Sequence, residues 1–406
     1  MSAGAKAVGL SFKIDDVWYD SWTSAEVTRD LKDFAGSFSA TYRDPDRSIA
    51  TFPYASPPPI FKLRPGLPVE AYADGQLVLV GFIETVEPSI DEGQASVSIG
   101  GKDKAGDLID CAAMPEGPSE FKNAKLEDAA SRICEPFGLS VRTEIDTDKP
   151  FDRYAIDVAE FAHHSIEKRA RQRHALVMSD GVGGVVITRS GQNRAPAELK
   201  LPGNVLGSQA TFTHQARHSE TIVRGQSEKA EGRRDGRSAA FVPGDDPVDP
   251  MDREDGDGSA TERERRGTAV TGRATDDEIG RYRPIVFLAR TKASEEELAD
   301  EADWRMRTRR AECEEATYRV KGFGADGRLW RVNELASVSD TYLDIERDML
   351  ISRVTFREDD GPTRETELAV SSPEAFAKGE VGSARTNLER KSSPSQAGLD
   401  GTAEAL

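Results

Sequence analysis

Apolar and polar residues alternate in short runs from the start of the chain to about residue 104. Such a period of two places every second side chain on the same face of a β-strand, where it can be buried. The clearest apolar sets are Leu10, Phe12 and Ile14; Phe38, Ala40 and Tyr42; and Ala95, Val97 and Ile99. Asp74-Gly75 adds a hairpin signal, because Gly tolerates the positive φ of tight turns. We therefore expect a first antiparallel β-barrel domain over residues 1–104.

The apolar pattern changes to that of a helix after this domain. Apolar residues recur at helical spacing at Leu126, Ala129, Ala130, Ile133 and Phe137. Gly138 follows at the position where a left-handed residue ends many helices. A helix is then expected over about 163–173, followed by a strand over 174–178. A glycine-rich turn over 180–184 should lead into another strand over 185–188. These patterns predict an α+β domain over residues 105–200.

The composition changes abruptly after a strand-like segment at 209–225. Residues 227–280 are rich in Arg, Asp, Glu, Gly and Ser and nearly lack large apolar side chains. Burial of so few apolar groups cannot offset the entropy that is lost when a chain becomes ordered. We therefore predict a mobile charged insertion over 227–280.

Regular structure is expected to resume after the insertion. Ser294 and Glu297 form a capping box for a helix at about 294–313. The buried stripe of this helix is predicted to contain Leu298, Ala302 and Met306. Short strands are expected to follow at 318–320, 329–332, 335–338 and 349–356.

These strands predict a second β-barrel domain, built from residues 201–226 and 281–372 and containing the helix at 294–313. Residues 373–406 are rich in Ser, Gly, Lys and Glu and are expected to form a flexible C-terminal tail. The expected fold class is therefore α+β and mostly β. It combines two small antiparallel β-barrels with an α+β domain.

The size and charge of the chain narrow the classes of function. A length of 406 residues exceeds what one hydrophobic core serves, so about two to four domains are expected. The formal net charge of -18 disfavours nucleic-acid binding, because polyanions are held by Lys and Arg. The sequence shows no signal-peptide pattern and no run of about 18 apolar residues. We expect no membrane insertion.

The cysteines indicate a reducing environment. Cys111, Cys134 and Cys313 are odd in number, far apart in the sequence and without CxxC spacing. A disulfide framework or a zinc site needs pairs or clusters of cysteines. We interpret the three as reduced thiols of a protein made in a cytoplasm.

Two segments have a partial likeness to ligand sites. Gly181, Gly183 and Gly184 suggest a phosphate loop, but the predicted strand that follows cannot supply the helix N-terminus of such a loop. A hairpin turn is the favoured interpretation. The acidic run at 252–262 suggests a calcium loop, but Ala260 and Arg266 stand where that loop needs Gly and Glu. A solvated acidic stretch is the simpler interpretation.

The histidines and tryptophans are candidates for a metal site and a sugar-binding site, respectively. His163, His164 and His174 lack the spacing of metal ligands, and the first two point to different faces of a helix. The tryptophans Trp18, Trp22, Trp304 and Trp330 are compatible with a sugar-stacking platform. Core or interface anchors are the favoured interpretation of such residues. No GxSxG elbow and no HExxH motif is present. We therefore assign no catalytic, cofactor-binding or metal-binding residues, and the partner interface is unknown at this stage.

Two sets of segments carry a family resemblance. The front set lies at 36–39, 65–66, 75–84 and 104–111, where the last segment reads KAGDLIDC. The back set lies at 283–286, 302–311, 327–333 and 350–356, and includes GRLWRVN at 327–333. In order and spacing these segments resemble the baseplate hub proteins of Mu-like contractile-tailed phages. That family is related to the hub of T4-like phages, to phage late control D proteins and to the hub regions of type VI secretion spike proteins.

The resemblance implies a structural protein and not an enzyme. Members of the family are expected to form a homotrimer in which each subunit contributes two similar β-barrels of tube type to a ring. Such a ring adapts a threefold spike to a sixfold tail tube. The implied partners are the tail spike, the tube or tube-initiator protein and other baseplate proteins. The implied location is the virion tail baseplate, after assembly in the cytoplasm of the bacterial host.

The resemblance also implies that DNA passes through the ring without specific binding. We hypothesise that acidic side chains line the bore, so that the DNA does not adhere. Two alternatives stay open. The chain could be a tail-associated peptidoglycan hydrolase, which would clear cell-wall substrate, or a host glycan-binding tail protein, which would need exposed tryptophans.

Overall fold

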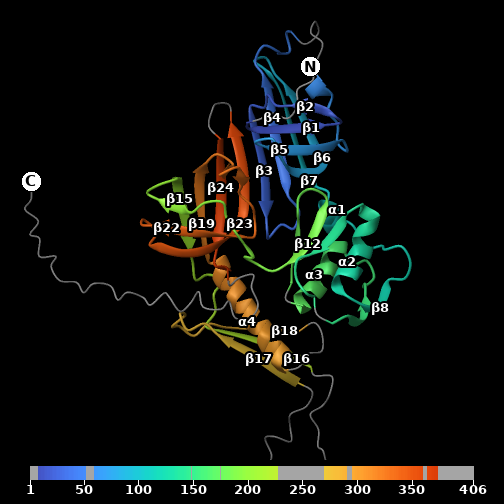
Figure 1. Cartoon of the computed structure of the whole chain (residues 1–406), viewed down its shortest axis with the longest axis vertical. Helices are drawn as coiled ribbons and strands as arrows, with labels where there is room; N and C mark the ends of the chain where they lie inside the picture. Colours follow the sequence, from blue (N-terminus) through green and yellow to red (C-terminus); the bar gives the residue numbers. More distant parts are fainter. Residues whose placement is uncertain are drawn as a thin grey trace, which may run out of the picture.

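The computed structural model describes residues 8–51, 59–147, 149–173, 175–226, 269–289, 295–359 and 364–373. The molecule is elongated and consists of four parts (Figure 1). A first β region lies at one end, with a second β region beside it and a unit rich in helices below it. A small unit of three strands and one helix forms the other end. Each helix in the described ranges is too short or too polar to cross a bilayer.

The first β region is built from antiparallel strands with alternating burial. Its elements are β1 (Leu10–Ile14), β2 (Val17–Tyr19), β3 (Ser24–Asp30), β4 (Ser37–Asp44), a 3-10 helix at Pro59–Lys62, β5 (Pro68–Ala73), β6 (Gln76–Ile90) and β7 (Ala95–Asp103). Leu10, Phe12 and Ile14 of β1 and Val97 and Ile99 of β7 are at most 3% exposed. The period of two therefore identified these strands correctly, and Asp74-Gly75 joins β5 to β6 as expected.

The α+β unit follows the first β region along the chain. Its elements are α1 (Gly106–Asp110), β8 (Glu120–Ala124), α2 (Leu126–Cys134), a 3-10 helix at Glu135–Phe137, β9 (Ser140–Thr143), β10 (Phe151–Ala155), α3 (Ala162–Gln172), β11 (Leu176–Ser179) and β12 (Gly184–Thr188). Both expected helices are confirmed. Leu126 and Ile133 of α2 are at most 1% exposed, and Gly138, with φ of 65°, ends this segment.

The second β region gathers strands from two parts of the chain. They are β13 (Asn193–Arg194), β14 (Leu199–Leu201), β15 (Val205–Phe212), β19 (Glu314–Lys321), β20 (Gly324–Ala325), β21 (Arg328–Leu329), β22 (Glu334–Asp340), β23 (Ile345–Asp359) and β24 (Arg364–Ser371). The strand expected at 329–332 is mostly absent, because the chain turns there through Asn333, which has φ of 65°.

The small unit consists of β16 (Glu220–Gln226), β17 (Ala269–Thr275), β18 (Pro284–Leu288) and α4 (Glu295–Glu312). Its strands form a separate sheet in the order β17-β16-β18, with α4 packed on it. Leu298 and Ala302 are fully buried in this contact, whereas Met306 is only half-buried. Gly272 is needed because a Cβ would lie 2.1 Å from the backbone carbon of Leu298.

The boundaries of this unit differ from the sequence expectation in two ways. Residues 269–275 fall within the range expected as a mobile insertion, yet they form β17, because pairing with β16 and cover by α4 compensate for their weak apolar pattern. Residues 227–268, the capping Ser294 and residues 374–406 of the expected tail lie outside the described residues. The helix and β16 were expected inside the second β-barrel domain, but they pack in this separate unit.

The small unit is tied to the second β region by a buried ion pair. The guanidinium of Arg217 contacts the Asp276 carboxylate at 2.8 Å, and both side chains are 3% exposed. Arg217 also reaches Glu314 of β19 at 3.2 Å and Glu278 at 2.7 Å. Such a buried cation is tolerated because several carboxylates surround it.

The two β regions form one continuous sheet. Its main path runs β15-β19-β24-β23-β3-β4-β7-β6-β5-β1-β2. The seam between the regions is the antiparallel pairing of β23 with β3. Apolar residues of both regions belong to one core cluster, from Leu10 to Val370. The protein is mostly β, as expected, but the closed barrels are not confirmed, because within the described residues the path ends at the separate edges β15 and β2.

The same five-strand arrangement occurs twice in this sheet. The strands pair in the order β5-β6-β7-β4-β3 in the first region and β22-β23-β24-β19-β15 in the second. The longest strand of each set, β6 or β23, has 15 residues. Each skips one residue where it pairs with the next strand, Glu84 in β6 and Ser352 in β23. When the two sets are aligned on this bulge, Phe356 of β23 corresponds to Pro88 of β6. The strand pairings that lead from there across each set show that Glu26 of β3 corresponds to Gln209 of β15.

Candidate assembly surface

The seam between β3 and β23 is polar on one face of the sheet. Arg357 faces Glu26 with an ion pair of 2.9 Å, and the Thr28 and Thr355 hydroxyls lie 3.0 Å apart. The hydrogen bond from Arg357 to Glu26 raises the pKa of the guanidinium above its usual value. Cross-strand pairs of this kind stabilise a sheet by a few tenths of a kcal/mol to about 1 kcal/mol each. They also favour one register over its neighbours.

The opposite face of the seam is apolar and buried. Ala25 and Val27 of β3 and Val354 and Phe356 of β23 are at most 4% exposed. The ring of Phe356 meets Phe323 edge to face, with centroids 5.4 Å apart. A one-residue slip would exchange these side chains with the charged ones of the other face, which makes the observed register strongly preferred.

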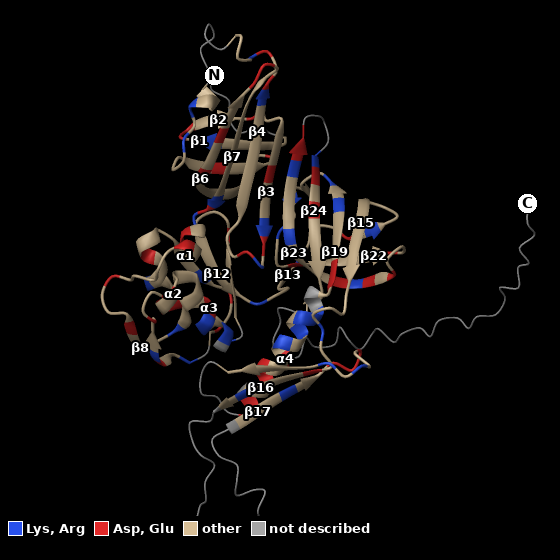
Figure 2. Cartoon of the chain, turned by 180° about the vertical axis from the view of Figure 1, so that it is seen from behind, with Lys and Arg blue, Asp and Glu red and all other residues tan. Residues whose placement is uncertain are grey.

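The polar face continues across the neighbouring strands. Carboxylates lie close to the cations, with Arg353 near Glu367 at 3.6 Å, Arg319 near Glu365 at 3.3 Å and Lys32 near Glu315 at 2.5 Å. Figure 2 shows acidic and basic residues alternating across β3, β23, β24 and β19. This face therefore presents neutralised pairs and hydroxyl groups to its surroundings instead of a continuous basic stripe.

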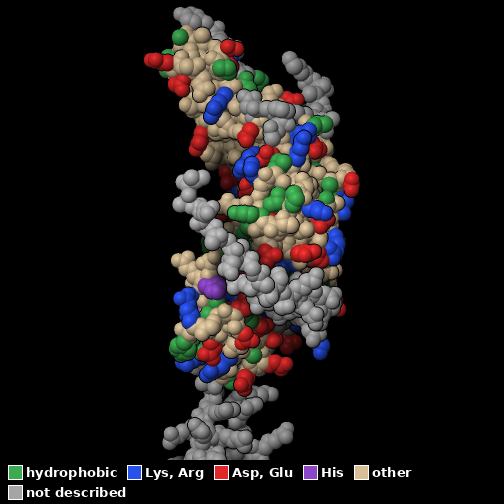
Figure 3. Space-filling model, turned by 90° about the vertical axis from the view of Figure 1, so that its left-hand side faces the viewer, with side chains coloured by type: hydrophobic (Ala, Val, Ile, Leu, Met, Phe, Trp, Pro, Cys, Tyr) green, Lys and Arg blue, Asp and Glu red, His purple; other side chains and the backbone are tan. Residues whose placement is uncertain are grey.

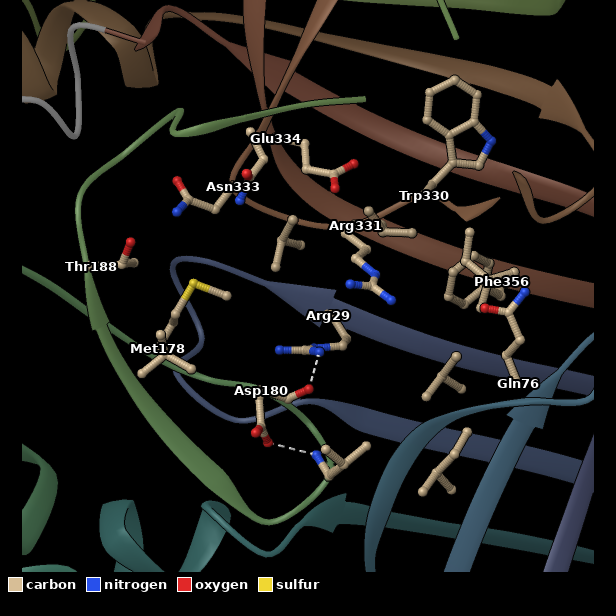
Figure 4. Close-up of a pocket in the computed structure, with 18 of the residues that line it drawn as sticks. Arg29, Gln76, Met178, Asp180, Thr188, Trp330, Arg331, Asn333, Glu334 and Phe356 are labelled. Atoms are coloured by element: carbon tan, nitrogen blue, oxygen red, sulfur yellow. Dashed lines mark hydrogen bonds between the residues drawn. The ribbon is translucent and has the colours of Figure 1, made fainter. Parts of the chain in front are cut away.

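A cavity of about 350 Å³ lies where the first β region, the second β region and the β11–β12 hairpin meet. Arg29, Met178, Asp180, Trp330 and Asn333 are among the residues that line it (Figure 4). They come from three of the four parts of the molecule. The cavity therefore marks the junction of the first β region, the second β region and the α+β unit.

Arg29 connects these parts. Its guanidinium donates hydrogen bonds to the carbonyl oxygens of Ser179 and Asp180, and Figure 4 shows the bond to Asp180. Burial lowers the pKa of Arg29, and the Asp103 and Asp180 carboxylates act in the opposite direction. A cation held by carbonyl oxygens is geometrically fixed. Its role is to position the hairpin against β3.

Asp103 completes the junction on the side of the α+β unit. Its carboxylate accepts hydrogen bonds from the amides of Gly36 and Ala105, both at 2.9 Å, and from the Ser179 hydroxyl at 2.8 Å. Burial raises the pKa of Asp103, although these hydrogen bonds favour its charged form. A buried carboxylate whose oxygens accept three hydrogen bonds fits a structural role.

The glycine turn considered as a phosphate loop is part of this junction. Gly181, Gly183 and Gly184 lie in the hairpin that connects β11 with β12, which confirms the hairpin interpretation. Gly181 has φ of +81°, and its carbonyl accepts a hydrogen bond from the Val80 amide at 2.7 Å. A Cβ at Gly181 would lie 2.7 Å from the Val78 carbonyl oxygen, so close docking on β6 requires glycine there.

The other candidate residues do not come together. His163 packs on Phe34 with ring centroids 4.3 Å apart, while His164 is exposed. His174 and the acidic run at 252–262 lie outside the described residues. Within the described ranges, no group of three or more His, Cys, Asp or Glu side chains is arranged to hold a metal ion.

The tryptophans occupy four different surroundings. Trp330 is 3% exposed, and Trp22 packs against the core. The ring centroids of Trp18 and Tyr72 lie 4.9 Å apart. The guanidinium carbon of Arg171 lies over the ring of Trp304 in α4, 5.4 Å from its centroid. A shared sugar-stacking platform is therefore not formed, which supports the interpretation as core and interface anchors.

Sequence reasoning missed the residues that form the seam and the junction. Arg29 and Asp103 carry no motif, and β3 was not among the expected strands. The alternation of Ala25 and Val27 with polar residues was the available signal for β3. Its pairing with a strand more than 300 residues away had no signal in the sequence pattern.

Models of three domain families match successive parts of the chain. Residues 9–103 match the N-terminal domain of the Mu phage baseplate assembly protein GpP-like family, and residues 294–379 match the fourth domain of the Mu phage baseplate assembly protein GpP. Residues 105–189 match the second domain of the gp44-like baseplate hub proteins. The three matches follow the order of the first β region, the α+β unit and the later strands.

Individual relatives agree with these matches over nearly the whole chain. The baseplate hub protein gp44 of Escherichia phage Mu is 28% identical over 400 residues, which cover 97% of this chain and 95% of that protein. The 43 kDa tail protein of prophage MuSo2 from Shewanella oneidensis has a TM-score of 0.73 at 27% identity, covering 90% of this chain and 99% of its own.

A tail protein from Neisseria meningitidis shares the fold, with a TM-score of 0.68 at 18% identity, and covers 91% of this chain and 98% of its own. The continuous sheet, the three domain matches in their proper order and the full-length similarity to a phage Mu hub lead to one conclusion. The chain belongs to the baseplate hub proteins of Mu-like phage tails.

Proposed function

We propose that this hub protein assembles as a homotrimeric ring that joins a threefold spike to a sixfold tail tube. The observation that carries the proposal is the duplicated five-strand arrangement, whose two copies sit side by side in one sheet. Three chains would then supply six similar sheet units around an axis. A sixfold partner can contact six similar units, while a threefold partner contacts the chains themselves.

The proposed partners are the tail spike, the tube or tube-initiator protein and neighbouring baseplate proteins. The proposed location is the baseplate of the virion, after assembly in the cytoplasm of the host. The names of the relatives support the tail and baseplate as the setting. The described helices offer no membrane-spanning segment that would require another setting.

The proposed bore of the ring is the polar face of the continuous sheet. On that face the cations lie next to carboxylates, as in the pair of Arg357 with Glu26. Neutralised cations release few counterions, so they bind DNA phosphates weakly. Together with the net charge of -18, this arrangement supports passage of DNA without adhesion through a bore that is acidic on balance. A ring structure whose bore presented rows of unpaired Arg and Lys would contradict this part of the proposal.

The mass of the purified protein in solution tests the ring. We expect light scattering to give three times the chain mass of 44.3 kDa, and a larger complex when the cognate spike is added. The mass should be measured over about 1–50 µM protein, a range in which interfaces of standard size associate. A monomer that ignores the spike would refute the proposed function.

We also propose that the chain has no catalytic role. Two buried charged groups at the junction, Arg29 and Asp103, are occupied in positioning the hairpin. The experiment is a zymogram with bacterial cell wall and an active lysozyme control. Clearing by the purified hub would show instead that it is a peptidoglycan hydrolase.

A further inference from the structure

Two of the strand edges that lack a partner within the described residues are related by the duplicated arrangement. One is the outer edge of β15, and the other is the edge of β6 along residues 85–90, beyond its pairing with β5. Figures 1 and 2 place β15 and β6 on opposite sides of the molecule. Free edges expose unpaired amide and carbonyl groups and favour pairing with another chain.

The duplicated arrangement specifies what each edge would bind. Inside the chain, the second half of β23 pairs with β3. By its pairing and its bulge, β6 is the equivalent of β23, and β15 is the equivalent of β3. We propose that β15 of one subunit pairs antiparallel with residues 85–90 of β6 in the next subunit, and so repeats the β3–β23 seam between subunits. This inference rests on the proposed ring and specifies its interface.

The internal seam also gives the register of the proposed junction between subunits, which is the pairing of β15 in one subunit with β6 in the next. On the core face, the paired residues of the two subunits would be Val86 with Phe212, Pro88 with Ala210, and Ile90 with Ser208. On the polar face, they would be Thr85 with Thr213, Glu87 with Thr211, and Ser89 with Gln209.

The backbone groups point in the directions that this register needs. The Thr213 amide donates to the Cys313 carbonyl at 3.1 Å, so by alternation the amides of Phe212, Ala210 and Ser208 face away from β19.

The same alternation holds in β6. The Asp91 amide donates to Gln94 at 3.0 Å, so the backbone groups of Val86, Pro88 and Ile90 face away from β7. Pro88 has no amide hydrogen, so the junction would lack one ladder bond of the internal seam.

The side chains are complementary in the same register. Phe212 is 60% exposed and Ile90 is 39% exposed, although both lie on the face that is buried at the internal seam. Figure 3 views the side of the molecule that carries β15 and shows apolar side chains gathered at its middle height. On the polar face, each pair joins hydroxyl, amide or carboxylate groups without placing like charges together.

The contrast between the two long strands supports an absent neighbour. Val354 and Phe356 of β23 are covered by β3 and are at most 3% exposed. Their equivalents in β6 are half-buried Val86 and exposed Pro88, which pair with β7 on one side and have no described strand on the other. A second copy of the chain supplies the missing strand, because β15 is the equivalent of the strand that covers β23. Head-to-tail contacts between different edges close into a ring when the rotation permits.

A disulfide cross-link tests the register. Ser89→Cys combined with Gln209→Cys, in a Cys111→Ser background that removes the exposed native thiol, places two thiols at a non-hydrogen-bonded pair. Such pairs have Cα atoms about 4.5 Å apart, within the range for disulfides. We expect mild oxidation to convert most of the protein into covalent dimers and trimers, with the closed trimer as the limit.

Two matched double variants and the two single variants make the result specific. Glu26→Cys with Arg357→Cys is the equivalent pair inside the chain, and it should form an intrachain disulfide without changing the mass. Ser89→Cys with Ala210→Cys places the thiols on opposite faces of the sheet, and it should not cross-link. Neither Ser89→Cys nor Gln209→Cys alone should form dimers, whereas a mixture of the two single variants should.

The cross-linking result, taken together with the mass in solution, distinguishes failure of the proposed junction between subunits from failure of the proposed ring. If the parent protein is a trimer by mass and the double variant gives no interchain disulfide while the internal control forms, the proposed junction is wrong and the ring remains. If the protein is a monomer at all concentrations, the ring and the junction both fail. Dimers formed by one single variant alone would show a contact between identical edges and would also overturn the junction.

Phe212→Ala gives a second measurement that does not depend on oxidation. The side chain is exposed in the single chain, so we expect the unfolding temperature of the diluted monomer to stay the same. At the junction it would meet Val86 of the neighbour, so the dissociation constant of the ring should rise at least tenfold. An unchanged dissociation constant would count against the proposed register.

Discussion

At the scale of single residues, the junction between the hairpin and the β regions depends on one close backbone contact and on the hydrogen bonds of two buried charged side chains. Gly181 approaches the Val78 carbonyl, Arg29 donates to two carbonyl oxygens, and Asp103 accepts three hydrogen bonds. Apart from the bond between Ala105 and Asp103, these contacts join parts of the chain that are far apart in sequence. Substitutions here should therefore affect the relative position of the parts as well as stability.

Gly181→Ala tests this close contact. The substitution combines an unfavourable positive φ with an overlap against the Val78 carbonyl, where the Cβ would lie 2.7 Å away. Gly66→Ala is the matched control, because Gly66 has φ of +89° and nothing within 4 Å of the added Cβ. We expect the control to lose about 1–2 kcal/mol of unfolding free energy, and Gly181→Ala to lose at least about 1 kcal/mol more. Equal losses in urea titrations would show that the contact is unimportant.

The cysteines should differ sharply in reactivity. Cys111 is exposed, Cys134 and Cys313 are buried, and burial raises the pKa of the Cys134 thiol to about 12. The thiolate is the reactive form, so at about pH 8 Cys134 stays protonated, and its reactivity should rise only as the pH approaches its pKa. We expect a thiol reagent to label Cys111 alone in the native protein and all three cysteines after denaturation. Fast labelling of a Cys111→Ser variant would contradict this expectation.

At the scale of elements, two periodicities and the rules of helix capping identified much of the secondary structure. The strands β1, β4 and β7 and the helices α2 and α3 followed from their apolar spacing. β17 did not, because its sequence contains only Ala269, Val270 and Ala274 as apolar residues and its stability comes from neighbours. The expected second barrel also included β16 and α4, which the tertiary contacts separate from it.

Phe356→Ala tests the seam as an element contact. Phe356 is 3% exposed between β3 and Phe323, so truncation would leave a cavity in the shared core. We expect the unfolding free energy to fall by about 3–5 kcal/mol. Tyr342→Ala is the control, because Tyr342 is 80% exposed and its loss should change stability by less than about 0.5 kcal/mol. Calorimetry should show the two β regions unfolding together in the parent protein, and two separate transitions there would argue against a stabilising seam.

At the scale of the whole molecule, the sheet converts a single chain into a pair of similar units. The seam fixes the second unit beside the first, and the ion pairs on its polar face neutralise the cations there. A net charge of -18 adds a repulsive field around the subunit. These features agree with the proposed passage of DNA without adhesion.

A direct binding experiment tests this property. We expect no retardation of linear double-stranded DNA by the purified protein between about 50 and 200 mM salt. The physical reason is the acidic net charge together with the pairing of Arg353, Arg357 and Arg319 with carboxylates. Triple replacement of Glu26, Glu365 and Glu367 by Gln should remove the nearest carboxylate from each cation, leaving Arg353 only its longer contact with Asp30 at 4.0 Å, and should produce weak, salt-sensitive binding. Tight binding by the parent protein at 150 mM salt, with Kd below about 1 µM, would contradict the expectation.

The sequence by itself determined the local elements and the overall acidic character, because alternation, helical spacing and charge are properties of neighbouring residues. The family resemblance added the hub assignment, through segments such as KAGDLIDC at 104–111. Only the tertiary structure decided which strands pair across the chain, and hence that β5-β6-β7-β4-β3 recurs as β22-β23-β24-β19-β15. Backbone amides and carbonyls make the ladder and are common to almost all residues, so Pro88 and Phe356 occupy equivalent positions with no likeness in sequence.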